Sequence, residues 1–479
     1  MNLTAVNHAA DNIRVLAASM VEKAKSGHPG GAMGGADFVN VLYSQFLITD
    51  PDDGKWLGRD RFFLDPGHMS PMLYSVLALF GHYTIDELQQ FRQWGSPTPG
   101  HPELHPERGV ENTSGPLGQG HTMAVGCAIA ERFLAARFGE WLSHKTYAFI
   151  PDGGIQEEIS QGAGRLAGHL GLSNLIMFYD SNKVQLSTMV NEVDDEDVAA
   201  KYRAWGWNVL ECNGNDPEEI AKAIAEAQGE KERPTIIIGH TVMGRGCVKA
   251  DGSCFEGQCS THGQPLSASG ADYAATMRNL GADPENPWVI FEDVKALYEA
   301  RREQLREIVK TRRAEQAAWE AANPELAKEL NAFLNNKLPE IDWAAIPHKP
   351  NIASRQASAD VLGVLAEKVN NMIVSSADLA NSDKTDAFLK KTHPFVKGDF
   401  SGAFLHAGVT ELTMASVMNG IALHGGVIGA CGTFFVFSDY MKPTVRMAAL
   451  MELPVKYIWT HDAFRVGEDR PTHEAVEQE

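Results

Sequence analysis

The sequence lacks any long uninterrupted run of apolar residues. No stretch approaches the roughly 20 residues of a membrane-spanning helix, although 44% of the 479 residues are hydrophobic. The first residues also lack the charged and apolar segments of a secretory signal peptide. We therefore expect a globular protein of the cytoplasm that has no membrane partner.

Basic residues and cysteines are also scarce. Lysine and arginine number 42 against 62 aspartates and glutamates, which gives a formal net charge of −20. This excess of negative charge disfavours nucleic acid and anionic membranes as partners, whereas phosphorylated substrates need only a local basic pocket. The six cysteines are scattered along the chain, so we expect free thiols rather than a disulfide framework.

What the sequence does contain is a strand–helix–strand pattern between residues 146 and 184. The apolar run 147–150 ends at Asp152, a helical pattern follows, and a second apolar run, 175–179, ends near Asn182. Two strands joined in this way are expected to be parallel, with a right-handed crossover. Asp152 and Asn182 would then lie side by side at the carboxyl ends of neighbouring strands, where open α/β sheets bind ligands.

The chemistry of this pair of side chains leaves two interpretations open. A carboxylate and an amide oxygen are hard ligands that suit Mg²⁺ or Ca²⁺. Gly153 and Gly154 would let a diphosphate approach the backbone and the helix N-terminus. The alternative is that Asp152 and Asn182 only cap local turns.

Three histidines stand in glycine-flanked loops of the N-terminal region. They are His28 in Ser-Gly-His-Pro-Gly, His68 in Gly-His-Met-Ser and His101 in Thr-Pro-Gly-His-Pro-Glu. Each alone would be an ordinary capping or surface histidine. Together they predict one polar site built from loops, where histidine suits proton transfer near neutral pH.

The chain divides into two α/β regions separated by a helical and proline-containing segment. We expect a first domain over residues 1–284, a charged helical segment and linker over 285–350, and a second domain over 351–479. The predicted fold class is α/β, with two doubly wound parallel sheets.

Two features of the second region involve acidic or aromatic groups. Glu411 begins a helix, where the helix dipole favours a carboxylate, so an ordinary first-turn glutamate is one explanation. Phe434, Phe437 and Tyr440 recur at a spacing of three residues. Such a stripe is more often part of a core than a binding surface.

Several of these motifs, in this order and at this spacing, resemble the transketolase family. The thiamine-diphosphate motif of that family is Asp-Gly followed, after a helix and an apolar strand, by Asn. The matching stretches are SGHPG, GHMS, TPGHPE, TSGPLGQG, VTELTMASVMNGIALHGG and the run from Gly467 to His473. The resemblance covers essentially all 479 residues and implies a thiamine-diphosphate-binding fold, with thiamine diphosphate and Mg²⁺ or Ca²⁺ as cofactors.

The resemblance implies a cofactor site made from both domains. The metal would be held by Asp152, Asn182 and the carbonyl of Val184. The residues that would meet thiamine diphosphate are His68, Gly115, Leu117, Gly153, Asn182, His262, Asp378, Phe434, Phe437 and Tyr440. In the family, the aromatic residues that match the last three hold the aminopyrimidine ring.

It also implies residues that act on the substrate. The catalytic residues would be Glu411, His28, His101, His473 and Glu157. Glu411 would hydrogen-bond the pyrimidine ring, and Glu157 would belong to a proton path between the two cofactor sites of a dimer. The substrate-binding residues would be His28, His262, Arg355, Ser382, His461, Asp469 and His473.

The implied reaction is the reversible transfer of a two-carbon ketol unit from a ketose phosphate to an aldose phosphate in the pentose phosphate pathway. The enzyme would be a homodimer with shared active sites. A related thiamine enzyme, deoxyxylulose-phosphate synthase, is the nearer alternative, and an inactive fragment that only binds a partner is the more distant one.

Two departures from the family pattern bear on this choice. Pro151 stands where the motif usually opens with glycine, and Arg470 stands where the family has glycine. Pro151 has no N–H to offer a phosphate. The sequence also stops short of the third domain of the family, which leaves a separate C-terminal domain chain open as a further partner.

Overall fold

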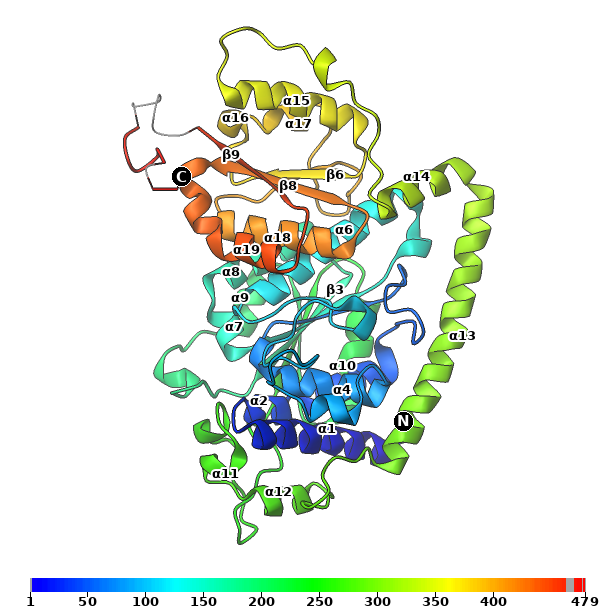
Figure 1. Ribbon diagram of the computed structural model, residues 1–479, viewed down its shortest axis with the longest axis vertical. Helices are drawn as coiled ribbons and strands as arrows, with labels where there is room; N and C mark the ends of the chain where they lie inside the picture. The colour runs from blue at the N-terminus through cyan, green and yellow to red at the C-terminus, as the bar shows by residue number, and fades with distance from the viewer. Residues whose placement is uncertain (1, 462–468, 476, 479) are drawn as a thin grey trace. The chain divides into compact units, whose positions relative to one another are not determined.

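The computed structural model consists of two compact units, each built on its own parallel sheet (Figure 1). It describes residues 2–461, 469–475 and 477–478. The first unit comprises residues 1–121, 144–158 and 173–311, and the second comprises 122–143, 159–172 and 312–479. Because the chain passes between the units several times, neither unit is one continuous segment. The expected domain boundaries at residues 284 and 350 stay a prediction.

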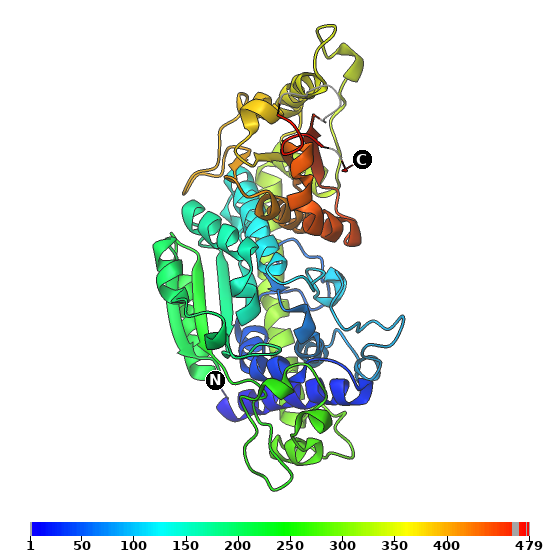
Figure 2. The ribbon, with the colours of Figure 1, turned by 90° about the vertical axis from the view of Figure 1, so that its left-hand side faces the viewer.

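The first sheet has five parallel strands in the order β1-β2-β3-β5-β4. They are β1 (Arg61–Leu64), β2 (Thr146–Pro151), β3 (Leu175–Ser181), β4 (Asn208–Asn213) and β5 (Thr235–His240). β5 and β4, coloured green, lie side by side in Figure 2. β2 and β3 run in register from Thr146 opposite Leu175 to Pro151 opposite Asp180, which confirms the predicted parallel pair.

The helices of the first unit enclose an apolar core. They are α1 (Leu3–Ala24), α2 (Pro29–Gly34), α3 (Ala36–Val41), α4 (Ser70–Phe80), α5 (Ile85–Leu88), α7 (Asp152–Gln156), α9 (Val198–Ala204), α10 (Pro217–Gly229), α11 (Leu266–Ser269) and α12 (Tyr273–Asn279). α1 packs against α3 and α4, and Phe38 of α3 stacks on Phe178 of β3 at 4.0 Å between ring centroids. This packing anchors the loops that follow α1 and β3.

The second sheet has four parallel strands in the order β7-β6-β8-β9. They are β6 (Met372–Ser376), β7 (Phe404–His406), β8 (Ile428–Phe434) and β9 (Lys456–Thr460). The helices of this unit are α8 (Glu158–Leu170), α14 (Pro324–Leu334), α15 (Ser354–Lys368), α16 (Ala380–Asp383), α17 (Asp386–Leu389), α18 (Glu411–His424) and α19 (Ser438–Leu450). Two further helices, α6 (Gln119–Phe138) and α13 (Glu292–Ala322), also have residues in both units, whereas α8 has only Glu158 in the first. Two parallel-sheet α/β domains are therefore present, as predicted.

Glycines allow α6 and α18 to cross at very short range within the second unit. A β-carbon at Gly126 of α6 would overlap the carbonyl oxygen of Val417, and one at Gly420 of α18 would overlap the carbonyl oxygen of Met123. Only glycine permits such an approach of two backbones. The crossing fixes the position of α18, whose first residue is Glu411.

The segment after β2 differs from its expected form. The helical spacing of residues 155–170 suggests one helix, but the structure has α7 and α8, separated at Glu157 with φ −59° and ψ 138°. The apolar positions keep the helical period across the break, so the pattern does not reveal it. Among the helices that the structure describes, none is both long and apolar enough to cross a membrane.

Candidate active site

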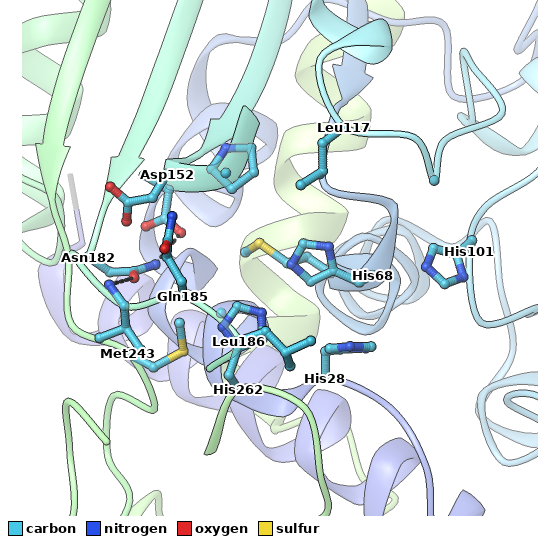
Figure 3. Close-up of a pocket in the computed structure, with 17 residues that line it drawn as sticks. His28, His68, His101, Leu117, Asp152, Asn182, Gln185, Leu186, Met243 and His262 are labelled. Carbon is cyan, nitrogen blue, oxygen red and sulfur yellow. Dashed lines mark hydrogen bonds between the residues drawn. The ribbon is translucent and has the colours of Figure 1, made fainter. Parts of the chain in front are cut away.

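A cavity of about 370 Å³ opens at the carboxyl ends of β2 and β3. Every residue that lines it belongs to the first unit. Of the predicted site residues, it brings together His28, His68, His101, Gly115, Leu117, Asp152, Gly153, Asn182, Val184 and His262. Figure 3 shows Asp152 and Asn182 at one side of the cavity and His28 and His101 at the other, with His68 and His262 between them.

Asp152 is held in a fixed orientation by two hydrogen bonds. The carboxylate, 3% exposed, accepts from the hydroxyl of Tyr179 at 2.6 Å and from the backbone N–H of Lys183 at 2.9 Å. Burial raises the pKa of Asp152, while the Tyr179 hydrogen bond and the charge of Lys183 pull it down. Lys183 adopts a φ of 63°, a left-handed conformation that non-glycine residues enter at a cost.

The amide of Asn182 is held at both ends. Its Oδ1 accepts from the N–H of Val184 at 2.9 Å, and its Nδ2 donates to Oδ2 of Asp180 at 3.0 Å. Asp180 is fully buried, also lines the cavity, and accepts a hydrogen bond from the hydroxyl of Thr241. Burial, with the nearby charge of Asp152, raises the pKa of Asp180 to about 7.

The donor set on this wall of the cavity fits a hard divalent cation. It combines the Asp152 carboxylate, the Asn182 amide oxygen and the backbone of Val184, all of which line the cavity. Oxygen ligands of this kind suit Mg²⁺ and Ca²⁺. In the part of the chain that the structure describes, no group of three or more His, Cys, Asp and Glu side chains is arranged to hold a metal. The expected set contains only one such side chain, and the rest of the coordination would come from the diphosphate and water.

The remaining walls fit a diphosphate and an organic ring. A β-carbon at Gly153 would come within 3.0 Å of Leu117, so glycine keeps this wall of the cavity open. Two buried imidazole nitrogens, Nδ1 of His28 and Nδ1 of His262, have no hydrogen-bond partner among the described residues. Such nitrogens are available to a bound molecule. Pro151 lines the same cavity and offers no N–H.

The histidines form one cluster. The ring centroids of His28 and His68 are 5.1 Å apart, those of His28 and His262 are 5.9 Å apart, and His68 stacks on His262 at 5.4 Å. Burial lowers the pKa of His28 to about 4, and the charge of Arg92 and the charge that His262 would carry when protonated add to this effect. Burial also lowers the pKa values of His68 and His262. The cluster is therefore neutral at pH 7.

A buried carboxylate organises the loop that carries Gly115 and Leu117. Asp65, which follows β1 and is fully buried, accepts from the N–H of Gly118 at 3.0 Å. It also accepts from the N–H of His121 at 3.2 Å and lies 3.1 Å from Nδ1 of that ring. Nothing in the sequence pattern singles out Asp65 or Asp180. The one available signal is their position at or just after a strand end, and exposed aspartates share it.

A second group of predicted residues gathers at the carboxyl edge of the second sheet. Phe434 ends β8, and its ring lies 4.4 Å from that of His461, which follows β9. Phe437 stacks on Phe434 at 5.7 Å and lies 5.4 Å from His473 and 6.0 Å from Tyr440. The expected core stripe is thus a partly open aromatic cluster, with Tyr440 63% exposed.

Glu411 lies at the N-terminus of α18 and is 8% exposed. Its Oε1 is 3.5 Å from the hydroxyl of Thr433, at the outer limit of a hydrogen bond. Burial raises the pKa of the Glu411 carboxyl. A carboxyl in this setting can hold a proton closer to neutral pH than an ordinary glutamate can.

Two pairings concern the predicted substrate residues of the second unit. Arg355 donates to the carbonyl oxygen of Ser382 at 3.3 Å and to its hydroxyl at 3.4 Å. The backbone N–H of Asp469 donates to Glu474 at 3.2 Å. Arg470 adopts a φ of 60°. Gly467 and Glu468, which begin the run that ends at His473, lie outside the described residues.

Asp378 and Glu157 do not line the cavity at β2 and β3. Asp378 lines a separate cavity of about 540 Å³ with Arg165 and His406. Glu157 is exposed, in the break between α7 and α8. Partial burial, together with the charges of Asp65 and Glu158, raises the pKa of Glu157.

Comparison with known proteins assigns each part of the chain to a domain family. Residues 5–339 match the family described as "Transketolase, thiamine diphosphate binding domain", and residues 350–479 match "Transketolase, pyrimidine binding domain". The two matches define a two-domain thiamine-diphosphate-binding protein of the α/β class.

Individual relatives agree with this assignment. The transketolase of Geobacillus stearothermophilus is 43% identical over 484 residues, which cover 97% of this chain and 70% of the relative, and that of Bacillus subtilis is 41% identical over 483 residues with the same coverage. The solved structure of Leishmania mexicana transketolase has a TM-score of 0.94 at 37% identity, over 98% of this chain and 70% of that chain. The chain belongs to the transketolase family, a family of transferases. The predicted family, fold class and enzyme class are therefore confirmed.

Proposed function

We propose that the protein transfers a two-carbon ketol unit from a ketose phosphate to an aldose phosphate in the pentose phosphate pathway. The observation that carries this proposal is the cavity in which Asp152 and Asn182 face a cluster of neutral histidines. Sugar phosphates as substrates are supported by related Pichia stipitis structures described as complexes with sedoheptulose-7-phosphate and xylulose-5-phosphate.

The first unit would bind the cofactor through its diphosphate. Asp152, Asn182 and the carbonyl of Val184 would hold Mg²⁺ or Ca²⁺, which neutralises the diphosphate. His68, Gly115, Leu117, Gly153 and His262 would surround the same molecule. Thiamine diphosphate, when bound, supplies the electron sink that side chains lack.

The protonation states of the site residues suit this chemistry. Glu411 can hold a proton on its carboxyl because burial raises its pKa, and would share it with the pyrimidine ring beside Phe434, Phe437 and Tyr440. His28 is neutral at pH 7 because its pKa is lowered to about 4, so it can both accept and donate. His28, His101 and His473 would polarise substrate hydroxyl and carbonyl groups.

The substrate phosphate would be bound by residues of both units. Arg355, with Ser382, His262 and His461, would contact the phosphate, and Arg355 would be the charge-assisted donor. The contact of Arg355 with Ser382 supports a joint role for these two residues. Asp469 would hold the hydroxyl next to the substrate carbonyl, Asp378 would contact the cofactor, and Glu157 would belong to a proton path between sites.

We further propose a cytoplasmic homodimer with two shared active sites. The support is that the metal-binding cavity is lined by the first unit alone, whereas the aromatic cluster and Glu411 belong to the second. Two subunits related by a two-fold axis could join one group of each kind at each site. All six cysteines are free thiols, which suits a reducing compartment. The comparisons give no support to the separate C-terminal chain that the sequence left open as a partner.

A product assay tests the proposed reaction and its nearer alternative together. The purified chain would be incubated with xylulose 5-phosphate and ribose 5-phosphate and, separately, with pyruvate and glyceraldehyde 3-phosphate. Each reaction would be run with and without thiamine diphosphate and Mg²⁺, and the products resolved by mass spectrometry. We expect cofactor-dependent formation of a seven-carbon ketose phosphate. Formation of a deoxyketose phosphate from pyruvate and glyceraldehyde 3-phosphate would instead favour the deoxyxylulose-phosphate synthase reading, and no product from either pair would favour an inactive protein.

A further inference from the structure

We infer that Asp180 is a positioning residue of the metal site: its carboxylate fixes the side-chain amide of Asn182 so that the amide oxygen faces the cation. This inference rests on the proposed binding of thiamine diphosphate with a divalent cation. It adds a residue that no sequence motif identified, and it gives that residue a role distinct from direct coordination.

The contacts of Asp180 define this role. Its carboxyl group is fully buried and lines the cavity. Oδ2 accepts from Nδ2 of Asn182 at 3.0 Å, and Oδ1 accepts from the hydroxyl of Thr241. Both hydrogen bonds come from neutral groups, so no ion pair among the described residues accounts for the burial of this carboxyl group.

An asparagine ligand needs such a neighbour because its amide has two ends of nearly the same shape. The oxygen can bind a cation, whereas the NH₂ group is a donor only. Oδ2 of Asp180 accepts from Nδ2 of Asn182, and this contact favours the orientation in which the NH₂ end of the amide points toward Asp180. The N–H of Val184, which donates to Oδ1 at 2.9 Å, selects the same orientation from the other end. Asp152 needs no such selection, since both its side-chain oxygens can bind a cation.

Two substitutions at position 180 separate positioning from charge. Asp180→Leu removes the acceptor and the charge in a side chain of similar size. Asp180→Asn removes the charge but keeps a carboxamide oxygen that can accept from Asn182, while the Thr241 hydroxyl turns to accept from the new NH₂ group. If the role is positioning, Asp180→Leu should weaken cation binding by about tenfold to a hundredfold, and Asp180→Asn should fall well below that range.

The probe is Mn²⁺, titrated into the full chain with thiamine diphosphate and followed by electron paramagnetic resonance. Thermal unfolding without Mn²⁺ reports whether each variant folds, and Asp180→Ala replaces Asp180→Leu if the latter does not. In an Asn182→Ala background the loss caused by Asp180→Leu should disappear, because the residue acts through that amide.

Each outcome bears on a different claim. Equal losses for Asp180→Leu and Asp180→Asn would show a role of charge alone and overturn the inference, as would a loss that persists in the Asn182→Ala background or no loss in Asp180→Leu. A wild-type chain that binds no Mn²⁺ in the presence of thiamine diphosphate would overturn the proposed metal site itself, and the inference with it.

Discussion

The two units present their predicted site residues in contrasting ways. In the first, Asp152 and Asn182 line one cavity and each is held by two hydrogen bonds. In the second, the Glu411 carboxyl lies at 3.5 Å from the Thr433 hydroxyl, and Tyr440 is 63% exposed. Both groups lie at the carboxyl ends of parallel strands, as the rule for open α/β sheets requires. In the proposed function, the preformed site of the first unit would provide affinity for the cofactor. Glu411 of the second unit would activate the cofactor.

The largest effect should come from removing Asp152, the proposed carboxylate ligand of the metal. Asp152→Ala should weaken binding of thiamine diphosphate with Mg²⁺ by at least about a hundredfold, because even outer-shell changes at metal sites cost tenfold to a hundredfold. Titration calorimetry gives the affinities. Glu411→Ala is the matched control from the other unit and should bind nearly as the wild type does. Equal affinities for Asp152→Ala and wild type would contradict the assignment of Asp152 as a ligand of the metal.

Glu411→Gln should lose activation while keeping affinity. Glutamine cannot hold an ionisable proton, and acid–base groups of this kind contribute about a hundredfold or more. Proton–deuterium exchange at the thiazolium carbon of the bound cofactor measures activation directly. If the variant exchanges at the wild-type rate, Glu411 does not activate the cofactor. The assignment of activation to the second unit would then lose its support.

The contributions of His28 in the first unit and Glu411 in the second to stability should depend on pH with opposite sign. The pKa of His28 is lowered from 6.5 to about 4 in the folded state, so unfolded chains take up the proton first and stability is lost as the pH falls from 6.5 toward 4. The pKa of Glu411 is raised above 4.5, so its contribution is present below that value and is lost as the pH rises through the raised pKa. Burial is the leading cause of both shifts.

Thermal unfolding across pH 4–8 tests this difference. His28→Gln should reduce the loss of stability on the acid side, and Glu411→Gln should flatten the loss on the other side. The effects should be modest, since other groups titrate in the same range. If His28→Gln leaves the acid-side slope unchanged, the histidine cluster is not the source of acid sensitivity.

The smallest effect concerns Arg470, which occupies a left-handed conformation with φ 60°. Arg470→Gly should relieve strain of about 1 kcal/mol and raise kcat/KM with a ketose phosphate donor, because the long cation next to Asp469 is removed. Lys384→Gly is the control: Lys384 has a φ of 69°, so its replacement should change stability without changing turnover. A fall in kcat/KM for Arg470→Gly would mean that arginine contributes to this loop.

Most of the fold was predictable because its elements carry strong periodic patterns. The pairing of Asp152 with Asn182 followed from the strand–helix–strand order alone. Asp65 and Asp180 could not be found in the same way, because a single aspartate near a strand end looks the same whether it is buried or exposed. The break at Glu157 was hidden by apolar positions that keep one helical period. The grouping of residues 122–143 and 159–172 with the second unit depends on tertiary packing that no local pattern records.

Subunit complementation tests the central claim most directly, namely that a metal-binding surface and an activating surface from two subunits make one active site. An Asp152→Ala chain and a Glu411→Ala chain, each inactive alone, would be mixed under conditions that allow subunit exchange. In a mixed dimer one site carries both lesions and the other carries neither, so we predict that partial activity returns. If sedimentation shows a mixed dimer and no activity returns, although the wild type is active, the shared-site account is contradicted.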